Sequence, residues 1–471
     1  MEPVIRSLHS YLTELAEREP KKPLLGSPDR WLDAAAVLER TEALARALEH
    51  QGIRPGDLVA LRTRRSLQTA LTMLALQTLG AVAVLTDPRK EPREFLRNSS
   101  VEIPAAHFID PAGLDVWELP PLPFPVRDVD PKAPSFIIFT SGSTGKQKAV
   151  MLSQYNLVNN LIDSQPLGYY REDDLALGAL PMDHVFGLVL LAGVCVLGYG
   201  MFFPDKTDIP SILSAIETQK LTRMNGVPSL YLAMAEQANQ YDLSSLRAGF
   251  IGGGPCTPEQ FRRIEEALGM TLISVYGMSE CIGVSCASFQ EPWEVRASGV
   301  GPFYSMNTGK ILLEDGSEAA PGQEGEIWVT GPARMVGYYP NAMPEDELLP
   351  TGDLGFVDGN GILHLTGRKK DIIIRNGNNL SARRIEEALL AISGVEDAAV
   401  VGLPDEKCGE IPYAIVVCKE DILRRIWIGL HQRLPKNEIP VEILRTAALP
   451  RTASGKTDKQ RIREVIRQWK A

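Results

Sequence analysis

The strongest constraint on this chain lies at residues 136–148, where an apolar run leads into a stretch of small polar residues. Residues 136–139 read Phe-Ile-Ile-Phe, which favours a buried strand. The next six residues are all glycine, serine or threonine: Thr140-Ser141-Gly142-Ser143-Thr144-Gly145. Glycines let the backbone turn tightly, and free N–H groups and hydroxyls suit phosphate oxygens. With Lys148 close behind, the stretch predicts a phosphate-binding loop, and a solvated Ser/Gly loop is the alternative.

Composition excludes several classes of protein. The 471 residues carry a net charge of −10 without a block of basic residues, which argues against nucleic acid as a partner. The six cysteines form no C-x-x-C pair, so neither a structural zinc site nor a disulfide framework is expected. Residues 1–18 are charged throughout and lack an apolar signal core. We therefore expect a cytoplasmic protein of two or three domains.

Residues 186–203 form an apolar segment whose length approaches that needed to cross a bilayer. The segment contains four glycines and no lysine or arginine. We interpret it as a buried helix followed by a buried strand, with a break near residues 198–200. No membrane span is expected.

Helical and strand patterns alternate through most of the chain. Helices at 32–51 and 66–79 alternate with strands at 57–61 and 81–85, which predicts a parallel sheet covered by helices. After residue 300, short strands at 310–314, 325–330 and 361–366 indicate a small antiparallel region. Further strands and helices follow from residue 372 and can form a compact α+β unit. The predicted fold is therefore α/β, with a large N-terminal domain at 1–369 and a small mobile C-terminal domain at 370–471.

Five further motifs carry residues suited to nucleotide or acyl chemistry. They are Leu180-Pro181-Met182-Asp183-His184-Val185-Phe186-Gly187, Gly252-Gly253-Gly254, Tyr276-Gly277-Met278-Ser279-Glu280, Thr351-Gly352-Asp353 with Gly367-Arg368, and Pro450-Arg451-Thr452-Ala453-Ser454-Gly455-Lys456. An aromatic ring can stack on a purine, and a carboxylate can hold Mg²⁺ or accept hydrogen bonds from two vicinal hydroxyls. Taken singly, each motif also fits a strand-ending turn, a packed core histidine or a solvated lysine.

Together, in this order, the motifs resemble those of the adenylate-forming enzymes, which include acyl-CoA synthetases, carrier-protein adenylation domains and luciferases. The resemblance places Tyr276 against adenine, Ser279 near the α-phosphate and Asp353 on the ribose hydroxyls, with Arg368 as its cationic companion. It assigns Mg²⁺ to Glu280 and Thr144. Two departures in the phosphate loop, Gln147 for proline and Ala149 for glycine, and Ala382 for proline leave the proposed charge-bearing groups intact.

The remaining motifs imply roles in catalysis and in the acyl site. Lys456 matches the lysine that stabilises charge as the acyl oxygen attacks phosphorus. His184 matches a residue at the mouth of the acyl pocket. The run Gly252–Gly254 borders adenine and the acyl group. Gly377 matches a residue lining the pantetheine tunnel, and Lys370 the hinge.

The resemblance implies an ATP-dependent activation of a carboxylic acid to an acyl-adenylate, followed by transfer to a thiol. The expected cofactors are ATP, Mg²⁺ and CoA, and the partner is an aryl or aliphatic carboxylic acid. An α-amino acid is disfavoured because the apolar Val185 stands where amino acid-activating relatives place an aspartate. Loading of a carrier-protein phosphopantetheine is the alternative to CoA. A nucleotide-binding sensor without catalysis would lack Lys456 or Glu280, and both are present.

Overall fold

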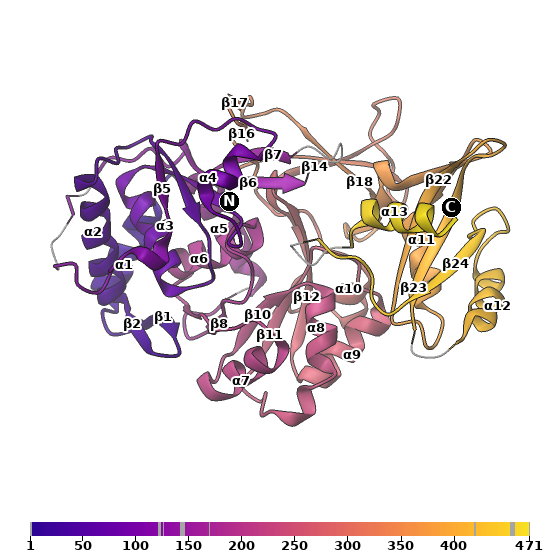
Figure 1. Cartoon of the computed structure of the whole chain (residues 1–471), viewed down its shortest axis with the longest axis horizontal. Helices are drawn as coiled ribbons and strands as arrows, with labels where there is room; N and C mark the ends of the chain where they lie inside the picture. Colours follow the sequence, from indigo (N-terminus) through magenta and orange to yellow (C-terminus); the bar gives the residue numbers. More distant parts are fainter. Residues whose placement is uncertain are drawn as a thin grey trace.

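The computed structural model of the chain describes residues 2–120, 124–125, 127–141, 147–168, 170–418, 421–452 and 457–470. The described residues form four β-sheets. Figure 1 shows two large sheets with their helices in the first three hundred residues and the yellow C-terminal part on the opposite side of the molecule. A smaller antiparallel sheet connects them in sequence.

The first large sheet has the strand order β17-β16-β7-β6-β4-β3-β5. Its strands are β3 (Leu58–Arg62), β4 (Val82–Thr86), β5 (His107–Ile109), β6 (Pro134–Ser141), β7 (Gln147–Ser153), β16 (Gly337–Tyr338) and β17 (Asn341–Ala342). Strands β5, β3, β4 and β6 run parallel, so their carboxyl ends meet at one edge. At that edge β6 turns back antiparallel into β7, with Thr140 opposite Lys148.

The second large sheet has the strand order β13-β12-β11-β10-β8-β9-β1-β2. Its strands are β1 (Pro23–Ser27), β2 (Arg30–Asp33), β8 (Leu175–Leu177), β9 (Gly200–Phe202), β10 (Arg223–Gly226), β11 (Ala248–Ile251), β12 (Thr271–Met278) and β13 (Cys281–Cys286). The six central strands are parallel, and β2 and β13 are antiparallel at the two edges. The predicted strand–helix alternation is therefore confirmed for both large sheets.

Helices cover these sheets, and local signals set where they begin and end. They are α1 (Leu8–Arg18), α2 (Ala34–His50), α3 (Leu67–Leu79), α4 (Pro92–Arg97), α5 (Gln154–Ser164), α6 (Val185–Leu197), α7 (Ile209–Gln219), α8 (Pro228–Ala235), α9 (Pro258–Leu268) and α10 (Trp293–Ser298). Helix α9 begins with a capping box between Thr257 and Gln260 and ends at Gly269, whose φ is 64°. Such caps satisfy backbone groups that a helix end leaves without partners.

The long apolar segment divides into a helix and a strand, as predicted. Helix α6 ends at Gly198, whose φ of 73° stops the helix, and β9 follows at Gly200. Among the described residues, the structure contains no helix with the length and apolar character needed to cross a membrane.

Two smaller sheets complete the described fold. The antiparallel sheet contains β14 (Thr308–Leu312), β15 (Gly325–Thr330), β18 (Leu349–Val357) and β19 (Leu363–Arg368). The C-terminal sheet contains β20 (Ile372–Arg375), β21 (Asn378–Ser381), β22 (Asp397–Asp405), β23 (Gly409–Val417) and β24 (Glu442–Thr446), with helices α11 (Ala382–Leu390), α12 (Leu423–Arg433) and α13 (Lys459–Lys470). The predicted α/β fold class is confirmed. The boundary predicted at residues 369/370 lies in a 3₁₀ turn, η4 (Lys369–Asp371).

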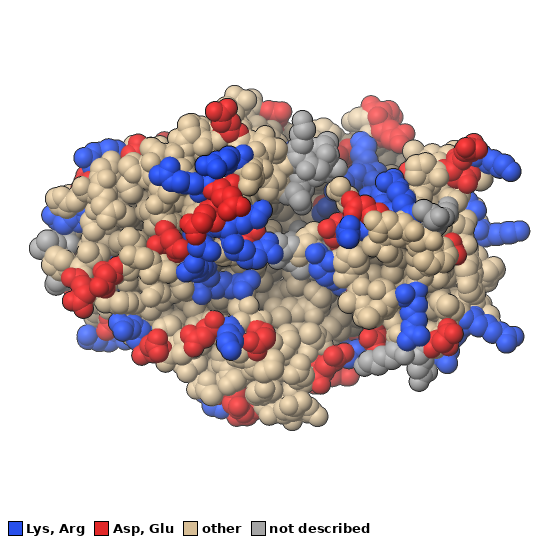
Figure 2. All heavy atoms as spheres, viewed as in Figure 1, with Lys and Arg blue, Asp and Glu red and all other residues tan. Residues whose placement is uncertain are grey.

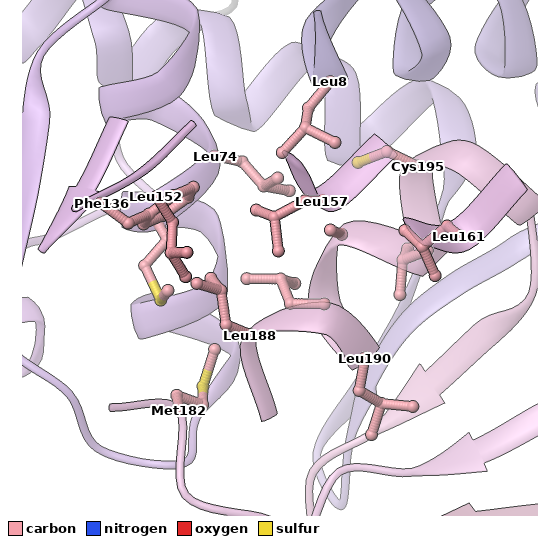
Figure 3. Close-up of a cluster of buried hydrophobic side chains, with 14 of the residues drawn as sticks. Leu8, Leu74, Phe136, Leu152, Leu157, Leu161, Met182, Leu188, Leu190 and Cys195 are labelled. Carbon is pink, nitrogen blue, oxygen red and sulfur yellow. The ribbon is translucent and has the colours of Figure 1, made fainter. Parts of the chain in front are cut away.

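The main core is built where helices meet the first large sheet. Figure 3 shows Leu157 of α5 among side chains from α1, α3, β6, β7 and α6. Leu157 is fully buried in this cluster. Close packing of this kind makes the removal of even a few methyl groups costly, because the surroundings relax only partly.

Leu157→Ala should lower the free energy of unfolding by about 2–5 kcal/mol, the range for buried leucines that leave a cavity. Urea unfolding followed by tryptophan fluorescence measures it. The matched control is Ile5→Ala, because Ile5 is 65% exposed near α1 and its loss should change stability by less than about 0.5 kcal/mol. Equal effects of the two substitutions would contradict this description of the core.

Candidate active site

The first cluster of polar residues is centred on the carboxylate of Asp353. Tyr276 Oη donates to Asp353 Oδ2 at 2.7 Å, and Arg368 Nε lies 2.8 Å from Oδ1. Tyr276 belongs to β12, whereas Asp353 and Arg368 face each other across β18 and β19. Three residues predicted to contact the same nucleotide are thus brought together by two sheets. Each carboxylate oxygen keeps a further lone pair for a ligand hydroxyl.

The sequence around Asp353 suggests a tight turn. In the structure, however, Asp353 lies inside strand β18. The turn-like sequence instead makes an irregularity in the strand. Glu326 pairs with Leu354 and Trp328 with Pro350, so residues 351–353 all lie opposite a single residue of β15. Gly352 has a φ of 72°, and Thr351 Oγ1 accepts from the N–H of Asp353 at 3.1 Å. A bulge of this kind re-aims a side chain, here the Asp353 carboxylate.

Burial sets the protonation of Tyr276. Only 7% of this residue is exposed. Burial, followed by the neighbouring Asp353 charge, raises the pKa of Tyr276 well above its ordinary value. The phenol therefore keeps its proton at neutral pH and remains a hydrogen-bond donor to the carboxylate. Arg368 is half exposed and forms the open side of the cluster.

The second cluster joins Glu280, Tyr338 and Lys148. Tyr338 Oη donates to Glu280 Oε1 at 2.8 Å. Lys148 Nζ lies 3.3 Å from that hydroxyl and 4.5 Å from the centre of the Tyr338 ring. Lys148 belongs to β7, directly opposite Thr140, so it stands on the stem of the hairpin that carries the Gly/Ser/Thr motif. This arrangement connects the predicted phosphate loop to the predicted Mg²⁺ carboxylate.

Tyr338 is not among the residues predicted from the sequence. It lies on the two-residue strand β16, which pairs with β7 across nearly two hundred residues of sequence. Burial raises the pKa of Tyr338, and the charge of Glu280 adds to this effect. The only feature of the local sequence that marks Tyr338 is a pair of aromatic residues before Pro340. A sequence alone does not reveal such a long-range pairing.

Both clusters use the β12–β13 hairpin. Strand β12 continues through Met278, and Ser279 and Glu280 form the turn before β13. Tyr276 and Glu280 thus stand four residues apart on one rigid hairpin. A Cβ at Gly277 would lie 2.1 Å from the carbonyl oxygen of Ile282, so only glycine allows the two strands to close here.

The glycine run 252–254 follows β11, which pairs with β12. The N–H of Gly252 donates to the carbonyl of Gly226 at 3.2 Å. A Cβ at Gly252 would lie 2.8 Å from the carbonyl oxygen of Val275, the residue before Tyr276. Gly252 therefore passes close to the residue before Tyr276, and its position beside adenine stays a prediction.

The other predicted residues lie on separate elements or outside the described part. Thr140 and Ser141 end β6, whereas Gly142, Ser143, Thr144, Gly145 and Lys456 lie outside the described residues. His184 is the residue before α6, and its carbonyl accepts from the N–H of Leu188 at 2.9 Å. Gly377 forms the tip of the β20–β21 hairpin with a φ of 77°, and no atom lies within 4 Å of a Cβ built there. Its turn conformation alone favours glycine.

The donor set around Glu280 fits a magnesium ion that a nucleotide brings with it. The described residues contain no group of three or more histidine, cysteine, aspartate or glutamate side chains able to hold a metal. Protein sites for nucleotide-bound Mg²⁺ need only one or two carboxylates, because phosphate and water supply the other ligands. Glu280 Oε1 accepts from Tyr338, and Oε2 can provide such a ligand.

Comparison with known proteins places the whole chain in one family. A family model described as "AMP-binding enzyme" matches residues 12–98 and 97–339, and one described as "AMP-binding enzyme C-terminal domain" matches residues 384–456. The chain belongs to the AMP-binding enzyme family. This AMP-binding enzyme is 31% identical to an indoleacetate–CoA ligase from Aromatoleum aromaticum, over 98% of both chains. It is 28% identical to a 2-succinylbenzoate–CoA ligase from Bacillus mycoides, over 98% of this chain and all of that one.

Solved structures agree with this assignment over the same extent. ATP-bound MatB from Rhodopseudomonas palustris superimposes with a TM-score of 0.88 at 25% identity, over 98% of this chain and 99% of that one. O-succinylbenzoate coenzyme A synthetase from Bacillus subtilis, in complex with ATP and magnesium ion, gives a TM-score of 0.81 at 25% identity. That match covers 96% of this chain and 99% of the synthetase.

A group of charged side chains lies beside His184 of this AMP-binding enzyme. Burial raises the pKa of Asp183 to about 6, and the charge of Asp87 adds to this effect, whereas Arg65 and Arg89 oppose it. Asp183 Oδ1 is buried and has no hydrogen-bond partner among the described residues. The two arginines have other partners, since Arg65 donates to Thr207 and Arg89 to Asp87. Ionised Asp183 is therefore poorly compensated in the folded state.

Asp183→Asn should stabilise the protein increasingly as the pH rises from about 4 to about 6. In that window the unfolded carboxyl, with an ordinary pKa of 3.8, has lost its proton while the folded one still holds it, so ionisation of Asp183 opposes folding. Above pH 6 the gain should stay constant at about 1–3 kcal/mol, because each tenfold difference in proton affinity between the folded and unfolded states is worth about 1.4 kcal/mol. Chemical denaturation at several pH values measures it. Asp346→Asn, which changes an exposed carboxylate, is the control. A pH-independent difference for Asp183→Asn would contradict the assignment.

Proposed function

We propose that this AMP-binding enzyme is an AMP-forming acid–CoA ligase, which activates a carboxylic acid with ATP and transfers the acyl group to CoA. The observation that carries the proposal is the β12–β13 hairpin, which bears Tyr276 and Glu280 and holds the two clusters side by side. One cluster offers a carboxylate for ribose, and the other connects a magnesium ligand to the phosphate-loop hairpin. The names of full-length relatives, acid–CoA ligases for chemically different acids, support the same reaction.

In this proposal ATP lies along the hairpin. Asp353 accepts hydrogen bonds from the ribose hydroxyls through its remaining lone pairs, with Arg368 beside the ribose and phosphate. Tyr276 and the glycines 252–254 border the adenine. Ser279 contacts the α-phosphate, and Thr140, Ser141, Gly142, Ser143, Thr144, Gly145 and Lys148 surround the other phosphates. Glu280 and Thr144 hold the nucleotide's Mg²⁺, which neutralises phosphate charge when bound.

The surface of the molecule supports the approach of a polyphosphate. Figure 2 shows this face hollowed between the part with the large sheets and the C-terminal part, with lysine and arginine side chains among acidic ones on both rims. Positive side chains at the rim of a cleft raise the local concentration of anionic ligands near them. The rims thus favour ATP and CoA, although the whole chain is acidic.

Catalysis of the first step is assigned to Lys456, which stabilises charge as a carboxylate oxygen attacks the α-phosphorus and pyrophosphate leaves. The small domain at 370–471 then rotates about Lys370 relative to residues 1–369. This movement withdraws Lys456, brings the hairpin with Gly377 towards the site and excludes water. The thiol of CoA attacks the acyl carbonyl, and AMP leaves. His184 lines the entrance for the acid.

The decisive experiment determines which acid is activated and which thiol accepts the acyl group. ATP–pyrophosphate exchange is measured with aryl, short, medium and long-chain acids, followed by thioester formation with free CoA or a holo carrier protein. At least one acid should support exchange, and its acyl group should pass to CoA. Exchange with transfer only to the carrier protein would support the alternative, carrier loading. Absence of exchange with every acid would remove the ligase proposal and favour a nucleotide sensor.

Lys456→Ala should reduce acid-dependent exchange by about a hundredfold or more, because one preorganised charge at a transition state is worth that much. A pre-made acyl-adenylate should still be converted to thioester at near wild-type rate, because Lys456 has left the site in that step. Rapid-quench assays of each half-reaction measure both. Lys436→Ala, which removes an exposed lysine of the C-terminal part, is the control. Exchange at wild-type rate in Lys456→Ala would show that the lysine's role is misassigned.

A further inference from the structure

The first residue of α13, Lys459, forms a cluster of ion pairs that the proposed chemistry does not use. Its Nζ lies 2.9 Å from Glu386 Oε1 on α11 and 3.4 Å from Asp371 Oδ2 at the end of η4. Arg463, one turn further along α13, approaches Asp371 Oδ1 at 3.9 Å. We call Asp371, Glu386, Lys459 and Arg463 the tail latch.

The carboxylates of the tail latch depend on Lys459. Only 9% of the Glu386 side chain and 16% of the Asp371 side chain are exposed. Burial raises the pKa of Glu386, and the charge of Lys459 is the main opposing influence. Glu386 Oε1 also accepts from the N–H of Val400 at 2.8 Å, which anchors it to β22. Without Lys459, two carboxylates would face each other with little water to separate their charges.

The latch joins two points that matter for the proposed reaction. Asp371 directly follows Lys370, the proposed pivot, and Lys459 stands three residues after Lys456. The tail is also held just before α13, because Arg451 pairs with Thr457 and the N–H of Asp458 donates to the carbonyl of Pro450 at 2.9 Å. The described residues on both sides of the segment that carries Lys456 are therefore held in place.

We propose that Lys459 is a positioning residue for the adenylation step. It fixes the start of α13 to the pivot segment and to α11, and so limits where the side chain of Lys456 can reach. The inference rests on the proposed function. An apolar contact could also hold α13, but ion pairs from Lys459 to two carboxylates specify one position of the helix start. Position matters because small displacements of a catalytic group cost much of its effect.

The test compares three single variants in the full-length protein. Lys459→Met removes the charge but keeps an apolar stem, and Lys459→Arg keeps the charge. Arg461→Met is the matched control, because Arg461 lies on the same helix with 57% of its side chain exposed and pairs only at the surface with Glu464. For each variant, ATP–pyrophosphate exchange and conversion of a pre-made acyl-adenylate to thioester are measured separately, with thermal unfolding.

Lys459→Met should lower kcat for exchange by about tenfold with less than about a twofold change in KM for ATP, since a misplaced catalytic group loses rate rather than substrate binding. Thioester formation from the adenylate should remain near wild type. Lys459→Arg should recover most of the exchange rate, and Arg461→Met should match the wild type.

If Lys459→Met does not fold, the double variant Lys459→Met/Glu386→Gln replaces it, because Glu386→Gln removes the uncompensated buried charge. The same changes in exchange and thioester formation are expected for this double variant. Equal losses in both half-reactions, unchanged exchange, or failure of Lys459→Arg to recover exchange would each overturn the positioning role. A wild-type protein without acid-dependent exchange would instead overturn the proposed function, and the inference would fall with it.

Discussion

The rest of the site depends on the contacts that the Asp353 carboxylate makes with Tyr276 and Arg368. The carboxylate is almost fully buried, so its charge requires the hydroxyl of Tyr276 and the guanidinium of Arg368. These contacts join β12 of a large sheet to the antiparallel sheet. On the same hairpin, Glu280 reaches through Tyr338 to the first large sheet. The two polar clusters thus connect three sheets through the β12–β13 hairpin. The side chains proposed to bind a nucleotide would be oriented there before it arrives.

Sequence reasoning predicts the fold best where local and tertiary preferences agree. Helices α2 and α3 lie within two residues of the predicted ranges 32–51 and 66–79, because each follows a polar N-cap, Asp33 or Ser66, that accepts a hydrogen bond from the first turn. The return strands β7 and β13 are not predicted. Each exists only because its partner strand lies beside it, and its own residues show no strong alternation. The bulge at Asp353 escapes prediction for a related reason, because a left-handed glycine indicates a turn or a bulge equally well.

The candidate site shows the same division. Residues carried by motifs, such as Tyr276, Glu280 and Asp353, can be nominated from the sequence, and the structure brings them together. Tyr338 cannot be nominated, since its place depends on a pairing of β16 with β7 that no local pattern encodes. Gly377 illustrates the opposite difficulty. Its left-handed backbone explains the glycine without any ligand, so the residue type alone does not distinguish a turn from a tunnel wall.

The two ionic clusters also constrain how the C-terminal part can move. Arg368 is bound to Asp353 on one side of the 3₁₀ turn, and Asp371 is bound to Lys459 on the other. Between these anchors lie only Lys369 and Lys370, neither of them buried. Lys369 pairs with Glu326 at the surface, and Lys370 is exposed between Lys369 and Asp371. A rotation can therefore be concentrated at one or two residues while both clusters stay intact, as hinge motions generally require.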